Sequence, residues 1–150
     1  MNNVKTLLLQ ACYDEVAKRK AVIEKALKNA QEAANQETKS SAGDKYETGR
    51  AMMHLEKEKL TGQMAEVLKM EQGLNLINPE KAYEQVELGA LVQTAQAAYY
   101  LSVSVGKLVI EGQTIFAVSP ASPIGKALLG KQSGEEFSFS GRTMKITALS

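Results

Sequence analysis

Two carboxylates, Asp44 and Glu47, stand three residues apart between two long stretches of helix-forming residues. Mg²⁺ prefers hard oxygen ligands and commonly takes only one or two carboxylates, with water and phosphate completing its shell. This pair of residue types could therefore organise a Mg²⁺ ion. Asp followed three residues later by Glu is also the pattern of a helix cap, in which the side chains satisfy N–H groups of the first turn. On spacing alone, the cap is the commoner explanation.

Other motifs exclude several kinds of site. The segment 125–132 nearly matches a phosphate-binding P-loop, but Gln132 stands where a Ser or Thr must hold Mg²⁺, and the interior of the segment is apolar. We therefore expect no nucleotide site there. His54 is the one histidine and Cys12 the one cysteine. A multi-histidine zinc centre, an internal disulfide and a Ser-His-Asp triad are therefore not expected within one chain.

The first part of the chain contains a cluster of basic residues that could face a polyanion. The cluster consists of Lys18, Arg19, Lys20, Lys25 and Lys28. Because Glu24 and Glu32 interleave with these cations, an ordinary solvated helix face is the commoner explanation.

Charge and hydropathy exclude broad classes of protein. The 150 residues carry 18 Lys and Arg against 17 Asp and Glu, which does not fit a polycation that coats nucleic acid. No apolar run approaches the roughly 20 residues that span a bilayer, and the amino end lacks the features of a signal peptide. We expect a soluble cytoplasmic protein with no membrane partner.

Composition changes near Pro79. Residues 1–79 hold four of the eleven glycines and two of the eight aromatic residues, and are rich in helix formers. Residues 80–150 hold the other glycines and aromatics, with many Val, Ser and Thr residues that suit strands. The sequence therefore predicts two domains, 1–79 and 80–150.

The first domain carries a seven-residue period typical of a coiled-coil seam. The period runs through two series, Leu9, Val16, Ile23 and Ala30, then Met53, Leu60, Val67 and Leu74. The series mirror each other about residues 41–42, inside a stretch, 39–43, that contains Ser and Gly. We predict an antiparallel coiled-coil helical hairpin with helices of about 30 residues each and its tip near 40–47.

The second domain alternates apolar segments with glycines, as expected for a small antiparallel sheet. The segments are 86–93, 99–105, 107–111, 114–118, 135–139 and 143–149. Ser122 suits a helix N-cap, Pro123 the first helical position and Gly130 the stop, so we predict one short helix there. The fold class is α+β, a helical hairpin joined to a β-rich domain.

Three segments together resemble the bacterial Gre transcript-cleavage factors, the family of transcription elongation factors that includes GreA and GreB. Gly43-Asp44-x-x-Glu47 is similar to the tip of the Gre helical hairpin. The segment 119–131, Ser-Pro-Ala-Ser-Pro-Ile-Gly-Lys-Ala-Leu-Leu-Gly-Lys, resembles the signature of the Gre carboxy-terminal domain, and 88–92 its opening strand. The resemblance covers nearly the whole chain in order and length.

The resemblance implies a partner and a mechanism. Gre-like factors bind the rim of the secondary channel of bacterial RNA polymerase with an FKBP-like carboxy-terminal domain, and extend the hairpin to the active site. There, tip carboxylates corresponding to Asp44 and Glu47 help hold a Mg²⁺ ion that is shared with the polymerase and is not bound stably by the free protein. The polymerase then cleaves the 3′ end of backtracked RNA. The factor itself is no enzyme and is expected to be a monomer.

The resemblance also implies contact residues. Lys45 and Arg50 near the tip, and the lysines of the first helix, would contact RNA or the channel wall. The candidates for binding the polymerase lie in the carboxy-terminal signature and are Ser119, Pro120, Ser122, Pro123 and Lys126.

The chain departs from the family at two places. Thr-Gly-Arg-Ala at 48–51 replaces the usual Asn-Ala-Glu-Tyr, and no acidic stretch is present around 105–115. Two alternatives therefore stay open. One is a Gre-like protein that occupies the channel without stimulating cleavage. The other is a coiled-coil adaptor or a prolyl isomerase-like module, which would need an apolar, aromatic-lined pocket.

Overall fold

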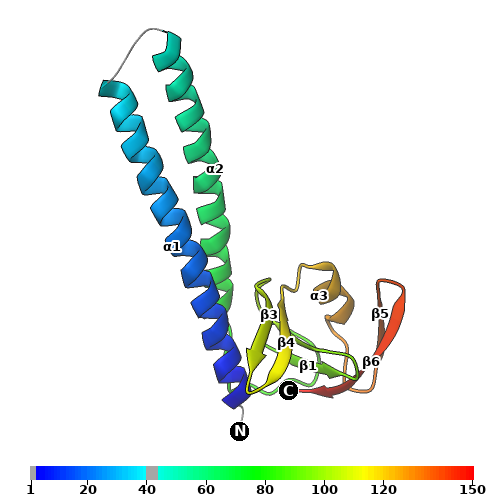
Figure 1. The fold of residues 1–150 in the computed structure, drawn as a ribbon. Helices are drawn as coiled ribbons and strands as arrows, with labels where there is room; N and C mark the ends of the chain where they lie inside the picture. Colours follow the sequence, from blue (N-terminus) through cyan, green and yellow to red (C-terminus); the bar gives the residue numbers. More distant parts are fainter. Residues whose placement is uncertain (1–2, 40–43) are drawn as a thin grey trace. The chain divides into compact units, whose positions relative to one another are not determined.

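The computed structural model describes residues 3–39 and 44–150, with side chains for 4–36 and 49–150. Two long helices, α1 (Asn3–Lys39) and α2 (Asp44–Asn75), precede six strands and one short helix (Figure 1). These are β1 (Leu91–Thr94), β2 (Ala98–Leu101), β3 (Gly106–Ile110), β4 (Gln113–Val118), α3 (Pro123–Leu128), β5 (Glu136–Phe139) and β6 (Arg142–Leu149). The predicted fold class is confirmed. Within the described ranges, no helix is both long and apolar enough to cross a membrane.

The chain forms two compact units whose boundary lies inside the helices. One unit is Val16–Met70. The other, which we call the β-rich unit, joins Met1–Glu15 to Glu71–Ser150. Secondary structure changes from helix to strand between α2 and β1, on either side of Pro79. By packing, however, the first turns of α1 and the last turn of α2 belong with the strands. The two units are described separately.

In the unit Val16–Met70, α1 and α2 run antiparallel (Figure 1). The predicted seam is buried at Val16, Ile23 and Ala30 on α1 and at Leu60 and Val67 on α2. Burial every seven residues keeps one stripe of each helix against its neighbour. On the surface, the Lys57 ammonium donates to Oε1 of Gln31 across the pair at 2.6 Å. The coiled-coil hairpin is therefore confirmed along this stretch.

The seam prediction is wrong at the amino end of α1. Cys12 is fully buried, as expected for a seam position, but Leu8 is fully buried in place of the predicted Leu9, which is only half-buried. Leu8, Cys12 and Val16 are four residues apart, so they form one helix face with a different period from the seam. The reason is a change of partner, because these turns pack in the β-rich unit, where Cys12 Sγ lies 3.5 Å from the Ser102 hydroxyl.

The strands form a six-stranded sheet in the order β3-β4-β2-β1-β6-β5. The prediction of an antiparallel sheet is wrong for one pair, because β2 and β4 are parallel, with Tyr99 beside Phe116. After β2 the chain passes to the edge as β3, then returns as β4 between β3 and β2, so β4 enters in the same direction as β2. One core cluster joins Leu101 and Ile146 of the sheet to Leu128 of α3.

Candidate functional site

The predicted polymerase-binding segment folds as a loop that hydrogen bonds hold against the start of α3. Ser122 is the N-cap of α3, and its hydroxyl accepts from the Gly125 N–H at 3.1 Å, as its type and position predicted. The same hydroxyl donates to the Ser119 carbonyl at 2.6 Å, and the Ser122 N–H donates to that carbonyl at 3.0 Å. Pro123 occupies the first turn, where a missing N–H costs nothing. One side chain therefore fixes both the loop and the helix start.

Gly125 permits this arrangement through its lack of a side chain. A Cβ added at Gly125 would lie 2.0 Å from the Ser119 carbonyl oxygen and 2.9 Å from the Pro120 Cα. Both neighbours are backbone atoms that are held by the cap, so neither can move away cheaply. In the sequence, this glycine belongs to a failed P-loop pattern and to the segment 119–131, and neither pattern gives it a structural role. Its requirement comes from a close approach of backbone that spacing does not reveal.

The structure brings all five polymerase-binding candidates onto this one loop and helix. Three of them, Ser119, Pro120 and Ser122, are half-buried and hold the loop together. Pro123 and Lys126 are exposed and are the two that a partner could reach directly. The segment therefore presents one proline ring and one cation on a rigid support.

Backbone hydrogen bonds within the chain argue against a phosphate-binding P-loop at 125–132. The Leu129 N–H donates to the Gly125 carbonyl at 2.9 Å, and the Gly130 N–H donates to the Val86 carbonyl at 2.9 Å. Leu128 is fully buried in the core. A phosphate cradle needs several N–H groups turned toward the ligand. These groups are engaged within the chain, as expected.

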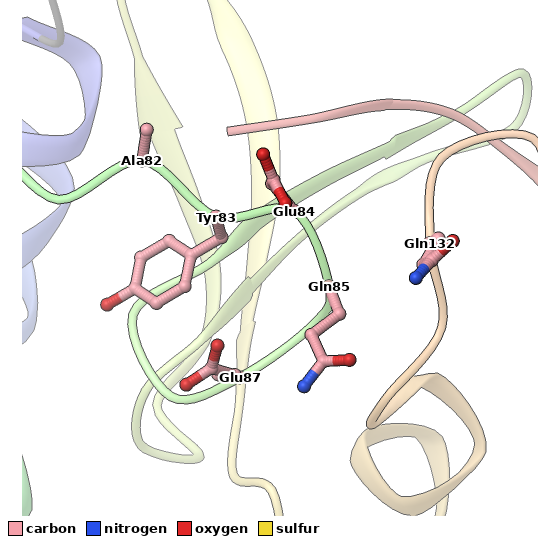
Figure 2. Close-up of a pocket in the computed structure, with 6 residues that line it drawn as sticks. All are labelled: Ala82, Tyr83, Glu84, Gln85, Glu87 and Gln132. Atoms are coloured by element: carbon pink, nitrogen blue, oxygen red, sulfur yellow. The ribbon is translucent and has the colours of Figure 1, made fainter.

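Beside this segment, a polar pocket of about 450 Å³ opens between two chain segments (Figure 2). The Val86 N–H donates to the Lys131 carbonyl at 2.8 Å, and Gln85 and Gln132 form an isolated antiparallel β-bridge. The two segments therefore run side by side. The pocket is lined by Ala82, Tyr83, Glu84, Gln85, Glu87 and Gln132. Figure 2 shows Gln132 on one segment and the other five lining residues on the other. With one aromatic ring and mostly polar walls, this pocket does not supply the lining that a prolyl isomerase needs.

Tyr83 lines this pocket, and two lysines that the sequence did not mark as functional lie against its ring. The ammonium of Lys5 lies 4.7 Å from the ring centroid and that of Lys81 lies 5.0 Å away. Lys5 is 1% exposed, and its ammonium donates to the Lys81 carbonyl at 2.5 Å. Burial lowers the pKa of Lys5, and burial followed by the Glu87 charge raises the pKa of Tyr83. The contact anchors the first turn of α1 in the β-rich unit.

At the tip, α1 ends at Lys39 and α2 begins at Asp44, as the sequence predicted. The side chains of Asp44, Lys45 and Glu47 lie outside the described residues, so their metal-organising arrangement stays a prediction. Among the side chains that are described, no group of three His, Cys, Asp or Glu could hold a metal ion. A Mg²⁺ ion at the tip would therefore depend on this carboxylate pair and on ligands from a partner.

Beyond the tip, α2 carries exposed polar side chains. Arg50 is exposed and Gly49 is half-buried. His54 Nε2 lies 3.2 Å from a Glu58 carboxylate oxygen, one turn along, and both side chains are largely exposed. That pairing is an ordinary contact on a helix surface, worth a few tenths of a kcal/mol. Arg50 is the one predicted contact residue near the tip whose exposure the structure describes.

Comparisons with known proteins found similar solved structures for this chain. No protein-family model matches the chain, and no curated protein matches it. One of the similar structures is the crystal structure of GreA factor homolog 1 (Gfh1) protein of Thermus thermophilus. The two chains are 22% identical, the match covers 92% of this chain and 94% of that chain, and its TM-score is 0.37.

Proposed function

We propose that this chain is a Gre-like transcription factor that binds bacterial RNA polymerase at its secondary channel and stimulates cleavage of backtracked RNA. This proposal is supported by two features that occur together in the chain. The segment 119–131, which resembles the Gre signature, folds as a capped loop whose Gly125 cannot be replaced without collision. The second helix of a long hairpin begins at Asp44, which starts the tip motif.

The length of the hairpin supports this proposal. α1 has 37 residues and α2 has 32, so α2 is about 48 Å long at 1.5 Å per residue. Its apolar seam is turned inward, and most of its outer surface is polar, with a few exposed apolar side chains such as Val22 and Leu55. Such a hairpin can enter a hydrated channel without exposing its core.

Asp44 and Glu47 would act together at the tip. Positions three apart on a helix share a face, and the helix dipole at the start of α2 favours ionised carboxylates. A Mg²⁺ ion shared with the polymerase would supply Lewis-acid stabilisation of the attacking and leaving oxygens. The chain's own part is to bring two ionised carboxylates to the polymerase, and it needs no catalytic group of its own.

The β-rich unit would supply the docking contact. Pro123 and Lys126 are exposed on α3, and Ser119 and Ser122 hold the loop beneath them. A rigid support reduces the entropy lost when a partner binds. In this proposal the unit determines affinity, and the tip determines what the bound factor does.

A second candidate is a channel-occupying regulator that does not stimulate cleavage, and the residues after the tip favour it. Gly49 is half-buried in α2 and weakens the helix there by about 1 kcal/mol relative to Ala. Arg50 is exposed one turn beyond Glu47, where a cation lowers the negative charge available to Mg²⁺. This candidate predicts binding with unchanged or reduced cleavage.

The test is RNA cleavage in reconstituted, backtracked elongation complexes of a bacterial RNA polymerase. The intact chain is compared with Asp44→Ala and Glu47→Ala, and with Glu56→Ala as a matched loss of a carboxylate elsewhere on α2. We expect the intact chain and Glu56→Ala to stimulate cleavage. The two tip variants should lose about 10²-fold, the scale of one lost electrostatic contact to a transition state.

Binding to the polymerase is measured in parallel, by displacement of a labelled copy of the chain. Binding by all variants with no stimulation by the intact chain would replace the cleavage proposal with the channel-occupying regulator. Failure of the intact chain to bind would overturn both candidates.

A further inference from the structure

A second surface lies on the hairpin, inside the unit Val16–Met70. A groove of about 460 Å³ runs between α1 and α2. Residues on its α1 side include Lys18, Arg19 and Val22, and residues on its α2 side include Glu66, Val67 and Met70. Neither the tip nor the segment 119–131 contributes to it. The groove therefore lies outside both the tip and the proposed docking segment.

The apolar side chain at the groove's edge is not needed by the hairpin. Val22 is 69% exposed, while its neighbour Ile23 is 8% exposed and Val67, across the seam, is 5% exposed. The seam is thus closed without Val22. A β-branched residue on a solvated helix face also lowers helix propensity slightly. Val22 adds little to folding and leaves apolar surface open to water.

The charge around Val22 is biased. Between residues 16 and 28 the sequence has five basic residues and one acidic residue, although the whole chain carries a net charge of only +1. Lys18 lies four positions before Val22 and Lys25 three positions after it, so both share its helix face. Arg19 lines the groove on the same helix. The α1 side of the groove is therefore an apolar strip bordered by cations.

We propose that this groove binds an amphipathic helix of a partner protein, whose apolar side chains pack on Val22 and Met70 and whose carboxylates face Arg19 on the α1 side, away from Glu66 on the α2 side. A helix fits the groove of a helix pair by packing its ridges between theirs. Recognition by apolar residues three and four apart is the usual mode for such grooves. The apolar side chains of the groove have no affinity for a phosphate backbone, and Glu66 on the α2 side repels one, so the groove favours an amphipathic helix over a nucleic acid. This interaction goes beyond the proposed function and does not depend on it.

The probes are two labelled peptides of about 14 residues, long enough for a partly helical segment. Both carry Leu at positions i, i+4 and i+7, flanked by Glu in one peptide and by Lys in the other. Binding to the intact chain is measured by fluorescence anisotropy. We expect the Glu peptide to bind about tenfold more tightly than the Lys peptide, a preference that falls as salt is added.

Two pairs of variants locate the contact. Arg19→Glu should weaken binding of the Glu peptide about tenfold, while Lys28→Glu, the same charge change on the same helix outside the groove, should weaken it much less. Val22→Ser should weaken both peptides. Its control is Leu55→Ser, because Leu55 is 64% exposed on α2 and does not line the groove. These side chains are exposed, so circular dichroism should show all four variants folded.

Amide shifts in ¹H–¹⁵N spectra on adding the Glu peptide should cluster at residues 18–23 and 63–70. The proposal is overturned by equal binding of the two peptides or by equal effects of Arg19→Glu and Lys28→Glu. Absence of peptide binding up to about 1 mM also overturns it. The proposal is also overturned if the groove binds the small apolar anion anilinonaphthalene sulfonate but neither peptide.

Discussion

Tyr100 shows how one buried residue can couple stability to pH. It lies on β2 with no exposed surface, and its hydroxyl has no hydrogen-bond partner among the described residues. An unpaired buried hydroxyl loses its hydration without compensation. Burial, followed by the nearby Cys12, Tyr83 and Tyr13, raises the pKa of Tyr100 well above its ordinary value.

We expect Tyr100→Phe to leave the free energy of unfolding unchanged or to raise it, because it removes a buried polar group that forms no hydrogen bond. The unfolded chain ionises its tyrosines from about pH 10, before the folded chain can ionise Tyr100. Stability of the intact protein should therefore fall as pH rises through that region, and Tyr100→Phe should reduce the slope. Urea unfolding from neutral to alkaline pH measures both effects.

The matched control is Tyr13→Phe, because the Tyr13 hydroxyl donates to Oδ1 of Asn75 at 2.5 Å. Its removal should lower the free energy of unfolding by about 1 kcal/mol at neutral pH. A larger loss in Tyr100→Phe than in Tyr13→Phe would contradict our account of the buried hydroxyl.

At the scale of elements, the loop before α3 depends on one glycine. Gly125→Ala would place a methyl group 2.0 Å from the Ser119 carbonyl oxygen, so the loop and the start of α3 must separate. We expect a loss of at least about 2 kcal/mol in the free energy of unfolding, the scale of strong overpacking. Thermal unfolding followed by circular dichroism measures it. If the loop is the polymerase contact, the same variant should also bind the polymerase more weakly.

Gly62→Ala makes the same chemical change at a position in α2 with nothing within 4 Å of the added Cβ. Because glycine is a poor helix former, this variant should be more stable by about 0.5–1 kcal/mol. The two substitutions should therefore have opposite signs. A Gly125→Ala protein as stable as Gly62→Ala would mean that the approach to Ser119 is not held as described.

Elements fixed by local chemistry were predictable from the sequence, and those fixed by distant partners were not. The hairpin seam at Ile23 and Leu60 follows from a seven-residue period, and the start of α3 follows from Ser122 and Pro123. The parallel pairing of β2 with β4 has no local signal, because the strands look alike in either direction. The role of Gly125, the placement of Lys5 against Tyr83 and the exposure of Val22 also depend on residues far along the chain.

At the scale of the whole molecule, the β-rich unit includes helix ends that the sequence assigned to the hairpin. The Lys5 ammonium donates to the Lys81 carbonyl, and Cys12 Sγ lies 3.5 Å from the Ser102 hydroxyl. Leu8 and Leu74 are fully buried. The compact unit is therefore Met1–Glu15 with Glu71–Ser150, which is larger than the strands and α3 alone.

A fragment of residues 80–150 should consequently be much less stable than the same strands in the intact chain. It keeps every strand and α3, but it loses the buried Leu8, Cys12 and Leu74 and the donor to the Lys81 carbonyl. Burial of each large apolar side chain contributes about 1.5–3 kcal/mol, which is a large part of the stability of a small domain. We expect the fragment to bind anilinonaphthalene sulfonate and to unfold at least about 10 °C below the β-rich unit of the intact chain.

The control is the fragment 71–150 mixed with a synthetic peptide of residues 1–15, which together contain the whole unit. Adding the peptide should raise the unfolding temperature and reduce dye binding, in proportion to peptide concentration, because a ligand that binds only the folded state stabilises it. A Lys5→Met, Cys12→Ala peptide should do this less well, since it lacks the two polar contacts seen at Lys81 and Ser102. If fragment 80–150 unfolds cooperatively at the temperature of the intact unit, the strands form their own domain. The helix ends would then be only attached to it.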